Sequence, residues 1–263
     1  MRVGRIAYTN VAPIETAFEA AAIVRPARVR AATPSALNAL IAAGELDAGP
    51  VSAAHYVQHQ DDLALLGDVC IAARGDVLSV LLVSRTPPAL LDGARIAVTR
   101  DSASGLALLN VLLRGRYNAQ ATFEPVDDAV AAALAGRPTL AIGDAAIALR
   151  DFIPATDRHD LGAAWHEWTR LPMVFAVWVV RRDVARRRSG EVARLAEAYA
   201  AAREWGATHR EEVIAAAQTR QPRFDAFYDR YFSTLLYTLD EDARAGLTRF
   251  AAEIAPEVSR VAR

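Results

Sequence analysis

The eight residues 173–180, MVFAVWVV, form an unbroken apolar run that directly follows Leu171 and Pro172. A short run of this kind, rich in valine and aromatic residues, is typical of a strand that is buried on both faces. A helix that crosses a bilayer needs about 20 apolar residues, so the run is too short for a membrane span. We expect this strand to carry the chain from a second lobe back into the first, with the active cleft beside it.

The segments before this run alternate between strand and helix patterns. Strands are expected at 3–9, 28–32, 46–50, 63–73, 77–84, 94–99, 122–126 and 139–142. Helices are expected at 13–22, 36–43, from 52 onward, and at 102–113, 127–135 and 143–150. After residue 180 the pattern predicts helices alone, at 191–205, 211–219, 224–235 and 240–254. Successive βα units favour a largely parallel sheet with right-handed connections.

The order of these segments predicts an α/β chain of two lobes. Residues 1–86 and 173–263 would form a discontinuous first lobe, and residues 87–172 a smaller α/β lobe inserted into it. We expect mixed, mainly parallel sheets and a C-terminal helical cluster, which is the two-lobe (type 2) architecture of periplasmic binding proteins. Ligands of such folds lie in the cleft between the lobes, at strand ends and helix N-termini.

The amino-acid composition excludes several classes of function. The 263 residues carry a net charge of −1 and are 53% hydrophobic, so no charge field favours nucleic acid or a membrane as a partner. All 30 basic residues are arginine, which excludes a Schiff-base lysine, a pyridoxal phosphate anchor and a P-loop lysine. The single cysteine, Cys70, is expected in the core and cannot form a disulfide within the chain. The first residues lack the apolar stretch of a signal peptide, so we expect a cytoplasmic location.

Polar or small residues stand where several strands end and helices begin. They are Thr9, Asn10, Ser52, Ser79, Ser102, Ala103, Ser104, Gly143 and Asp144. A helix N-terminus offers free N–H groups and the positive end of the helix dipole, which bind carboxylates without a formal cation. Ordinary N-capping, which stabilises a helix by about 1 kcal/mol, explains each of these residues equally well when it is taken alone. Several of them converging on one cleft would indicate a small anionic substrate, such as a dicarboxylate.

Other catalytic arrangements find little support in the sequence. His55 and His59 have a spacing that zinc sites use, but no third ligand is evident, so no metal site is expected. The sequence shows neither the Ser-His-Asp order of a catalytic triad nor a GxSxG motif. Nothing positions Asp144 and Glu167 as the carboxylate pair of a hydrolase. The residues alone indicate a two-lobe anion binder and leave open whether it is an enzyme.

Ordered motifs extend over nearly the whole chain. They are YTN at 8–10 with Pro13, LDAGP at 46–50, LSVLLVS at 78–84, IGDAA at 142–146, WHEWTRLPMVFAVW at 165–178 and YFSTLLYTL at 231–239. Together they resemble the menaquinone biosynthesis family of the futalosine route. One branch of that family removes water from chorismate. The other makes 1,4-dihydroxy-6-naphthoate and has a catalytic histidine followed by glutamate where this chain has Gly143 and Asp144, so Gly143 favours the first branch.

The resemblance implies a carbon–oxygen lyase that converts chorismate, a dicarboxylate, into 3-[(1-carboxyvinyl)oxy]benzoate without a cofactor. Asn10 would be the catalytic residue, hydrogen-bonded to the substrate near the reacting centre, and the Gly143 N–H would approach the substrate closely. The serines at 79, 102 and 104 would hold carboxylates. We hypothesise that the substrate's own enolpyruvyl carboxylate takes the proton, with Asp144 as the rival base. The naphthoate-forming enzyme and a non-catalytic carboxylate-binding protein are the alternatives.

Overall fold

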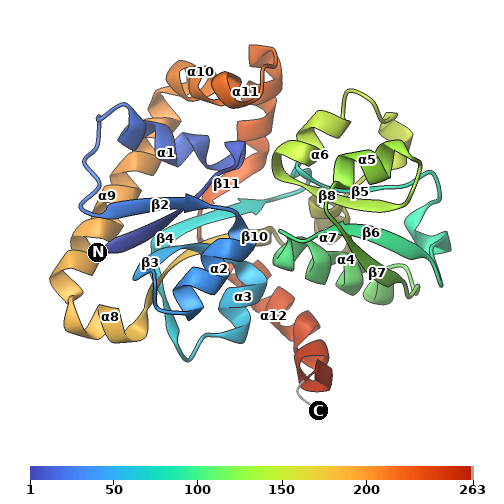
Figure 1. The fold of residues 1–263 in the computed structure, drawn as a ribbon, viewed down its shortest axis with the longest axis horizontal. Helices are drawn as coiled ribbons and strands as arrows, with labels where there is room; N and C mark the ends of the chain where they lie inside the picture. Colours follow the sequence, from blue (N-terminus) through green and yellow to red (C-terminus); the bar gives the residue numbers. More distant parts are fainter. Residues whose placement is uncertain (262–263) are drawn as a thin grey trace. The chain divides into compact units, whose positions relative to one another are not determined.

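The computed structural model describes residues 1–261 and divides the chain into two compact units, each with its own sheet (Figure 1). The first unit holds Met1–Ala72 and Phe175–Asp240. The second holds Ala73–Val174 together with the C-terminal helix α12 (Glu241–Val261). Both units combine a mixed sheet with helices, so the predicted α/β class is confirmed.

A six-stranded sheet forms the centre of the first unit, in the order β11-β4-β10-β3-β1-β2. Its strands are β1 (Arg2–Ile6), β2 (Arg28–Ala32), β3 (Ala48–Ser52), β4 (Leu63–Ala73), β10 (Met173–Arg181) and β11 (Leu235–Thr238). β1 pairs in parallel with β2 and β3, so the carboxyl ends of these three strands lie at the same edge of the sheet. β10 is antiparallel to β3.

Helices cover both faces of this sheet (Figure 1). α1 (Ala12–Glu19) and α9 (Ser189–Thr208) lie on one face, and α2 (Pro34–Ala42) and α3 (Ala53–Gln58) lie on the other. The unit also contains the 3₁₀ helix η1 (Thr9–Val11) and the helices α8 (Arg182–Arg187), α10 (Arg210–Arg220) and α11 (Asp225–Thr234). Within residues 1–261, no helix combines the length and the apolar character that a membrane span requires.

β10 is the strand that the apolar run 173–180 predicts. It lies between β4 and β3, and every residue from 173 to 180 is buried. Trp178, near the middle of the strand, is among the largest fully buried side chains. The division between the units falls within this strand, at residues 174–175, so the chain enters the first unit again along β10.

Gly206 allows α9 to approach α1 closely. A Cβ atom added to Gly206 would lie 1.7 Å from the carbonyl oxygen of Pro13 and 2.7 Å from its carbonyl carbon. No side-chain rotation can relieve such a contact because both atoms belong to the backbone. The approach therefore holds the first turn of α1 in place, directly after the end of β1.

The second unit has a five-stranded sheet in the order β7-β6-β8-β5-β9. Its strands are β5 (Val80–Val83), β6 (Arg95–Thr99), β7 (Thr122–Val126), β8 (Thr139–Ile142) and β9 (Arg158–Asp160). β6 is parallel to β7 and β8, whereas β5 is antiparallel to β8 and β9. The helices are α4 (Ala103–Gly115), α5 (Ala129–Leu134), α6 (Gly143–Leu149) and α7 (Leu161–Thr169), with the 3₁₀ helices η2 (Pro88–Leu90) and η3 (Ala155–Asp157).

The core of the second unit lies where α5 and α6 cover β5 and β8. Leu81 and Val83 of β5 pack there against Ala133, Ala146 and Leu149 of the two helices. α4 and α7 lie on the other side of this sheet (Figure 1). Because α6 begins directly at the end of β8, this core fixes the turn that contains Gly143.

The first division between the units falls earlier in the chain than the sequence predicts. β5 lies within the predicted first lobe, 1–86, but it pairs with β8 and β9 in the sheet of the second unit, so the chain crosses at residues 72–73. α12 also groups with the second unit, although 173–263 was assigned to the first lobe. The apolar run at 77–84 predicts a strand but carries no sign of the sheet that the strand joins.

The prediction of helices alone after residue 180 is wrong at β11. The sequence places 235 at the end of a helix, whereas Leu235–Thr238 joins the edge of the first sheet beside β4. The Leu239 N–H donates to the Asp68 carbonyl at 2.6 Å, just beyond the strand. Four residues that directly follow a helix carry too short a pattern to be recognised as a strand, and their pairing is set by β4.

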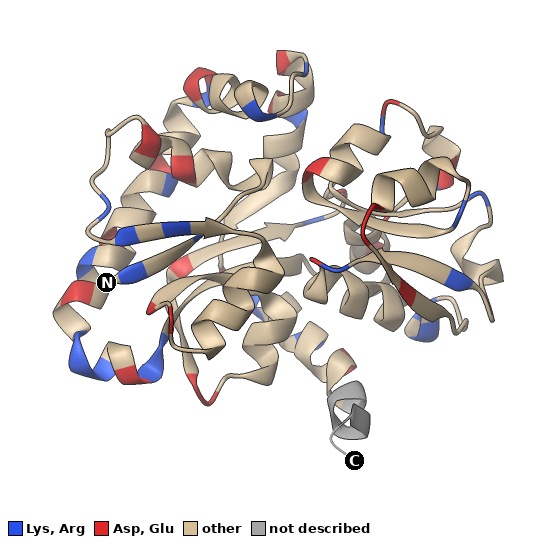
Figure 2. Cartoon of the chain, in the orientation of Figure 1, with Lys and Arg blue, Asp and Glu red and all other residues tan. Residues whose placement is uncertain are grey.

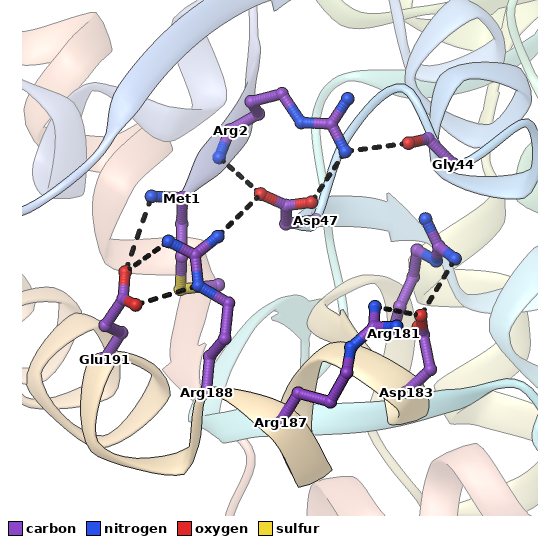
Figure 3. A network of polar contacts seen from close by, with 9 residues as sticks. All are labelled: Met1, Arg2, Gly44, Asp47, Arg181, Asp183, Arg187, Arg188 and Glu191. Carbon is purple, nitrogen blue, oxygen red and sulfur yellow. Dashed lines mark hydrogen bonds and ion pairs between the residues drawn. The ribbon is translucent and has the colours of Figure 1, made fainter.

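A polar network ties the start of β1 to the segment before β3 and to α9 (Figure 3). Asp47 accepts hydrogen bonds from the backbone N–H and the guanidinium group of Arg2, both at 2.8 Å. Arg188 lies 3.7 Å from Asp47 and forms an ion pair with Glu191 at 2.7 Å. Burial opposes ionisation of Asp47, but the hydrogen bonds and charge of Arg2, with the charge of Arg188, outweigh it and lower the pKa of the carboxyl group. An ionised Asp47 thus holds the LDAGP segment beside β1.

We expect Gly206→Ala to lower the free energy of unfolding by about 3 kcal/mol, the upper part of the range for overpacking, because the backbone of α1 must move to admit the methyl group. Chemical denaturation followed by circular dichroism measures this change. Gly190→Ala in the same helix is the control, since its added methyl group would meet only the flexible end of Arg194 at 3.8 Å. Equal stability of the two variants would show that the contact between α1 and α9 is loose.

Candidate functional site

In the first unit, Thr9 and Asn10 follow the end of β1 and form the 3₁₀ turn that leads into α1. Thr9 is fully buried and Asn10 is half-buried. Pro13 occupies the first turn of α1, where its missing N–H costs no helical hydrogen bond. The structure therefore places both residues at the strand-to-helix turn that the sequence predicts.

The two oxygen atoms of Asn10 have different environments. Its backbone carbonyl accepts a hydrogen bond from the hydroxyl of Tyr237, on β11, at 3.0 Å. Its side-chain oxygen, Oδ1, is buried and has no hydrogen-bond partner among the described residues. A buried acceptor without a partner is costly, so this atom is suited to receive a hydrogen bond from a ligand.

Ser52, at the end of β3, is the ordinary N-cap of α3. Its hydroxyl accepts the His55 N–H at 3.2 Å and the side-chain amide of Asn38 at 3.1 Å. The backbone N–H of Ser52 donates in turn to Asn38 Oδ1 at 3.2 Å. These hydrogen bonds give Ser52 a structural role. Asn38 shares this role, although the sequence analysis did not single it out.

In the second unit, Asp160 holds the segment that carries Ser79. Its carboxylate accepts the N–H groups of Val77 and Leu78, at 3.1 and 2.7 Å, and those of Gly162 and Ala163, at 2.9 and 3.1 Å. Burial raises the pKa of this carboxyl group, and the N–H bonds oppose that rise. One side chain thus caps α7 and fixes residues 77–78. The sequence analysis missed Asp160, and the Asp-Leu-Gly start of an amphipathic segment was the available signal.

Ser79 is buried directly after the part of the backbone that Asp160 restrains. Leu78 has a φ angle of +61°, a left-handed conformation that costs a non-glycine residue free energy and persists only where its surroundings enforce it. The Ser79 hydroxyl donates to the Val77 carbonyl at 3.3 Å. The strained segment therefore sets the direction in which Ser79 points.

Gly143 faces the same segment from the end of β8. Its N–H donates to the Ser79 carbonyl at 2.7 Å, so this amide is engaged within the unit, contrary to the prediction that it approaches the substrate. Its φ angle of +56° gives a separate reason for glycine at this position, because L side chains rarely adopt that conformation. Asp144 follows in the first turn of α6 and is half-buried.

Ser102 precedes α4 but does not cap it. Its hydroxyl makes no hydrogen bond with any described residue, and the residue is 8% exposed. A Cβ atom added to Gly105 would lie 2.2 Å from the Ser102 hydroxyl oxygen, so the absence of a side chain at 105 makes room for this hydroxyl. Ala103 is exposed and Ser104 is buried in the first turn. Ser102 is therefore the serine best placed to donate to an anion, and Gly105 is a supporting residue that the sequence analysis missed.

His55 and His59 lie on and next to α3, with their rings stacked at 4.1 Å. The His59 ring nitrogen Nδ1 is 2.8 Å from the His55 carbonyl oxygen. Burial, together with the neighbouring His59, lowers the pKa of His55 to about 4, so His55 is neutral at physiological pH. The residues that the structure describes contain no group of three or more His, Cys, Asp or Glu side chains placed to hold a metal ion.

Charged residues of both signs are spread along the two units, and basic and acidic residues occur together at α8 (Figure 2). None of the candidate residues is a cation. Recognition of a carboxylate by this set must therefore rely on hydroxyl groups, amides and helix N-termini. Within the second unit, hydrogen bonds bring Ser79 and Gly143 together; within the first, Asn10 and Ser52 follow neighbouring strands of one sheet.

Comparison with known proteins agrees with these features. The sequence profile of a family described as menaquinone biosynthesis matches residues 1–256. A chorismate dehydratase from Thermus thermophilus is 34% identical over 259 residues, which cover 93% of this chain and 91% of that protein. A solved structure from Archaeoglobus fulgidus covers 97% of each chain, with a TM-score of 0.75 at 20% identity. The periplasmic aliphatic sulphonate binding protein of Escherichia coli covers 98% of this chain and 92% of its own, with a TM-score of 0.67 at 16% identity. The predicted periplasmic-binding-protein fold is thus confirmed.

We expect Asp160→Asn to lower the free energy of unfolding by about 2 kcal/mol, because the amide NH₂ group must face backbone N–H donors that the carboxylate accepts. Faster hydrogen exchange at the amides of residues 77–78 should accompany this loss. Asp128→Asn is the matched control: Asp128 caps α5 at 2.9 Å, and asparagine caps a helix as well as aspartate does. Unchanged exchange at residues 77–78 in Asp160→Asn would contradict the role given to Asp160.

Proposed function

Because the chain belongs to the menaquinone biosynthesis family, we propose that it is a chorismate dehydratase, a lyase that removes water from chorismate. The similarity to the Thermus thermophilus chorismate dehydratase, over nearly the full length of both proteins, carries this proposal. The structure adds a set of uncharged polar groups that suits a substrate with two carboxylates. The expected cytoplasmic location stays a prediction.

The reaction is a 1,2-elimination that forms an aromatic ring. The proton at C3 and the hydroxyl group at C4 of chorismate leave together as one molecule of water, and the product is 3-[(1-carboxyvinyl)oxy]benzoate. Aromatisation supplies the driving force, so the protein needs only to hold the reacting geometry and to stabilise developing charge. No oxidant, reductant or cofactor is needed to balance this step.

Asn10 is the residue that we assign to the reacting centre. Its side-chain oxygen Oδ1 is buried without a partner, and it can accept a hydrogen bond from the substrate hydroxyl that leaves. Such a bond fixes the C–O bond in the direction that elimination requires. Thr9 and Ser52 belong to the same part of the first unit, where Thr9 shapes the turn and Ser52 caps α3.

The second unit supplies the groups that we assign to the substrate carboxylates. The Ser102 hydroxyl is a donor without a partner in the structure, and Ser104 lies one residue into the same helical turn. Ser79 can turn its hydroxyl from the long bond with Val77, at 3.3 Å, toward a ligand. Gly143 contributes by holding Ser79 through its N–H, and not by contacting the substrate with that group.

In this proposal the substrate's own enolpyruvyl carboxylate takes the C3 proton and passes it to the departing C4 hydroxyl group, which leaves as water. Asp144 is the rival base, since it lies in the first turn of α6 next to Gly143.

The direct test incubates the purified protein with chorismate and follows ultraviolet absorbance, with the product identified by mass spectrometry. We expect an aromatic product lighter than chorismate by one water. If the protein binds chorismate but releases no product, it is a binding protein. Failure both to bind chorismate and to convert it, with formation of 1,4-dihydroxy-6-naphthoate from the corresponding precursor, would indicate the other branch of the family.

We expect Asn10→Ala to lower kcat for chorismate at least about 100-fold, because the substrate hydroxyl loses the group that orients it. Ser52→Ala is the matched control, since Ser52 is held by Asn38 and its loss should affect stability more than turnover. Near-normal kcat in Asn10→Ala would remove Asn10 from the reacting centre.

We expect Asp144→Asn to retain turnover of chorismate within about tenfold of the unaltered protein, because the substrate carboxylate takes the proton. Steady-state kinetics with a separate measurement of substrate affinity checks this. Loss of turnover with unchanged affinity would identify Asp144 as the base and overturn the substrate-assisted route.

A further inference from the structure

The hydroxyl of Tyr237, on β11, contacts the backbone of Asn10 in the turn between β1 and α1. This hydroxyl donates to the Asn10 carbonyl oxygen at 3.0 Å, although the two residues are 227 positions apart in the sequence. The strand that carries Tyr237 is anchored on β4, where the Leu239 N–H donates to the Asp68 carbonyl and the Cys70 thiol lies 3.8 Å from the Leu236 carbonyl. Tyr237 is therefore presented to Asn10 from a fixed part of the sheet.

The Asn10 carbonyl cannot accept the 3₁₀ hydrogen bond that its own turn would otherwise supply. In the same 3₁₀ turn, the Thr9 carbonyl accepts the N–H of Ala12, three residues on. The equivalent donor for Asn10 would be residue 13, but that residue is proline and has no N–H. The Tyr237 hydroxyl supplies the missing hydrogen bond. Burial raises the pKa of Tyr237 well above its usual value, so the hydroxyl remains a donor throughout the physiological range.

We propose that Tyr237 is a positioning residue, which fixes the backbone of Asn10 and thereby aims the side-chain oxygen of Asn10 at the substrate. The inference rests on the role that the proposed function gives to Asn10. The bond to the carbonyl sets the plane of the peptide that follows Asn10, and the Asn10 side chain leaves the backbone one atom away. Without the bond, the turn is free to rotate and Oδ1 loses its direction.

The kinetic test compares Tyr237→Phe with Tyr228→Phe. Tyr228 is a buried tyrosine of α11 in the same unit, whose hydroxyl also donates to a backbone carbonyl, that of Gln221 at 2.6 Å. Both variants lose one hydroxyl and should lose similar stability. We expect Tyr237→Phe to lower kcat for chorismate about tenfold with KM little changed, and Tyr228→Phe to retain kcat. Unchanged kcat in Tyr237→Phe, or an equal loss in both variants, would overturn the inference.

A double-variant cycle separates positioning from general loosening of the fold. If Tyr237 acts through Asn10, Tyr237→Phe should lower kcat no further in a protein that already carries Asn10→Ala. A full additional loss in that background would show that Tyr237 acts by another route.

A second readout does not depend on chorismate. The chain has only four asparagines, at 10, 38, 110 and 118, so selective ¹⁵N-asparagine labelling gives four pairs of side-chain amide signals. Asn10→Ala assigns the Asn10 pair. We expect Tyr237→Phe to shift or broaden that pair and to leave the Asn38 pair in place, and Tyr228→Phe to change neither. An unmoved Asn10 pair in Tyr237→Phe would overturn the inference. If the Asn10 pair shifts in Tyr237→Phe but the unaltered protein fails to convert chorismate, the proposed function is refuted and the positioning of Asn10 by Tyr237 still stands.

Discussion

The burial of β10 on both faces is the constraint from which the rest of the first unit follows. All eight residues from 173 to 180 are buried, and a strand can be buried in this way only between two other strands and beneath helices on both sides. β3 and β4 are those neighbours. β1 pairs with the other side of β3 and is therefore two places from β10 in the sheet. The turn at Thr9 and Asn10 follows the end of β1. The burial of β10 in the centre of the sheet thus helps to determine where Thr9 and Asn10 lie, beyond the carboxyl end of β1.

The polar residues at the strand ends divide into two kinds. Ser52 and Asp160 use their oxygen atoms to satisfy backbone N–H groups, and they hold turns and helix starts in place. The side-chain oxygen of Asn10 and the hydroxyl of Ser102 have no such bond to a described residue, although both residues are largely withdrawn from water. The first kind makes a rigid frame, and the second kind is available to a ligand. Distinguishing the two requires knowledge of every neighbouring donor and acceptor.

Local patterns in the sequence predicted most of the elements. The strands expected at 28–32, 63–73, 122–126 and 139–142 coincide with β2, β4, β7 and β8, because alternation and turn residues are properties of neighbouring positions. The failures involve partners far apart in the chain. The pattern of residues 77–84 could not show that β5 joins the second sheet, and that of 235–238 could not show that β11 pairs with β4. For the same reason, neither the bond from Tyr237 to Asn10 nor the bonds from residues 77–78 to Asp160 could be predicted.

The left-handed turn at Gly143 limits which residues can replace this glycine. Gly143 has a φ angle of +56°, a conformation that L side chains rarely adopt. Any other residue placed there would raise the free energy of the folded state through the strained backbone, although its backbone N–H could still donate to the Ser79 carbonyl. Substitution at position 143 is therefore limited by the folding stability of the second unit as well as by the chemistry of the site.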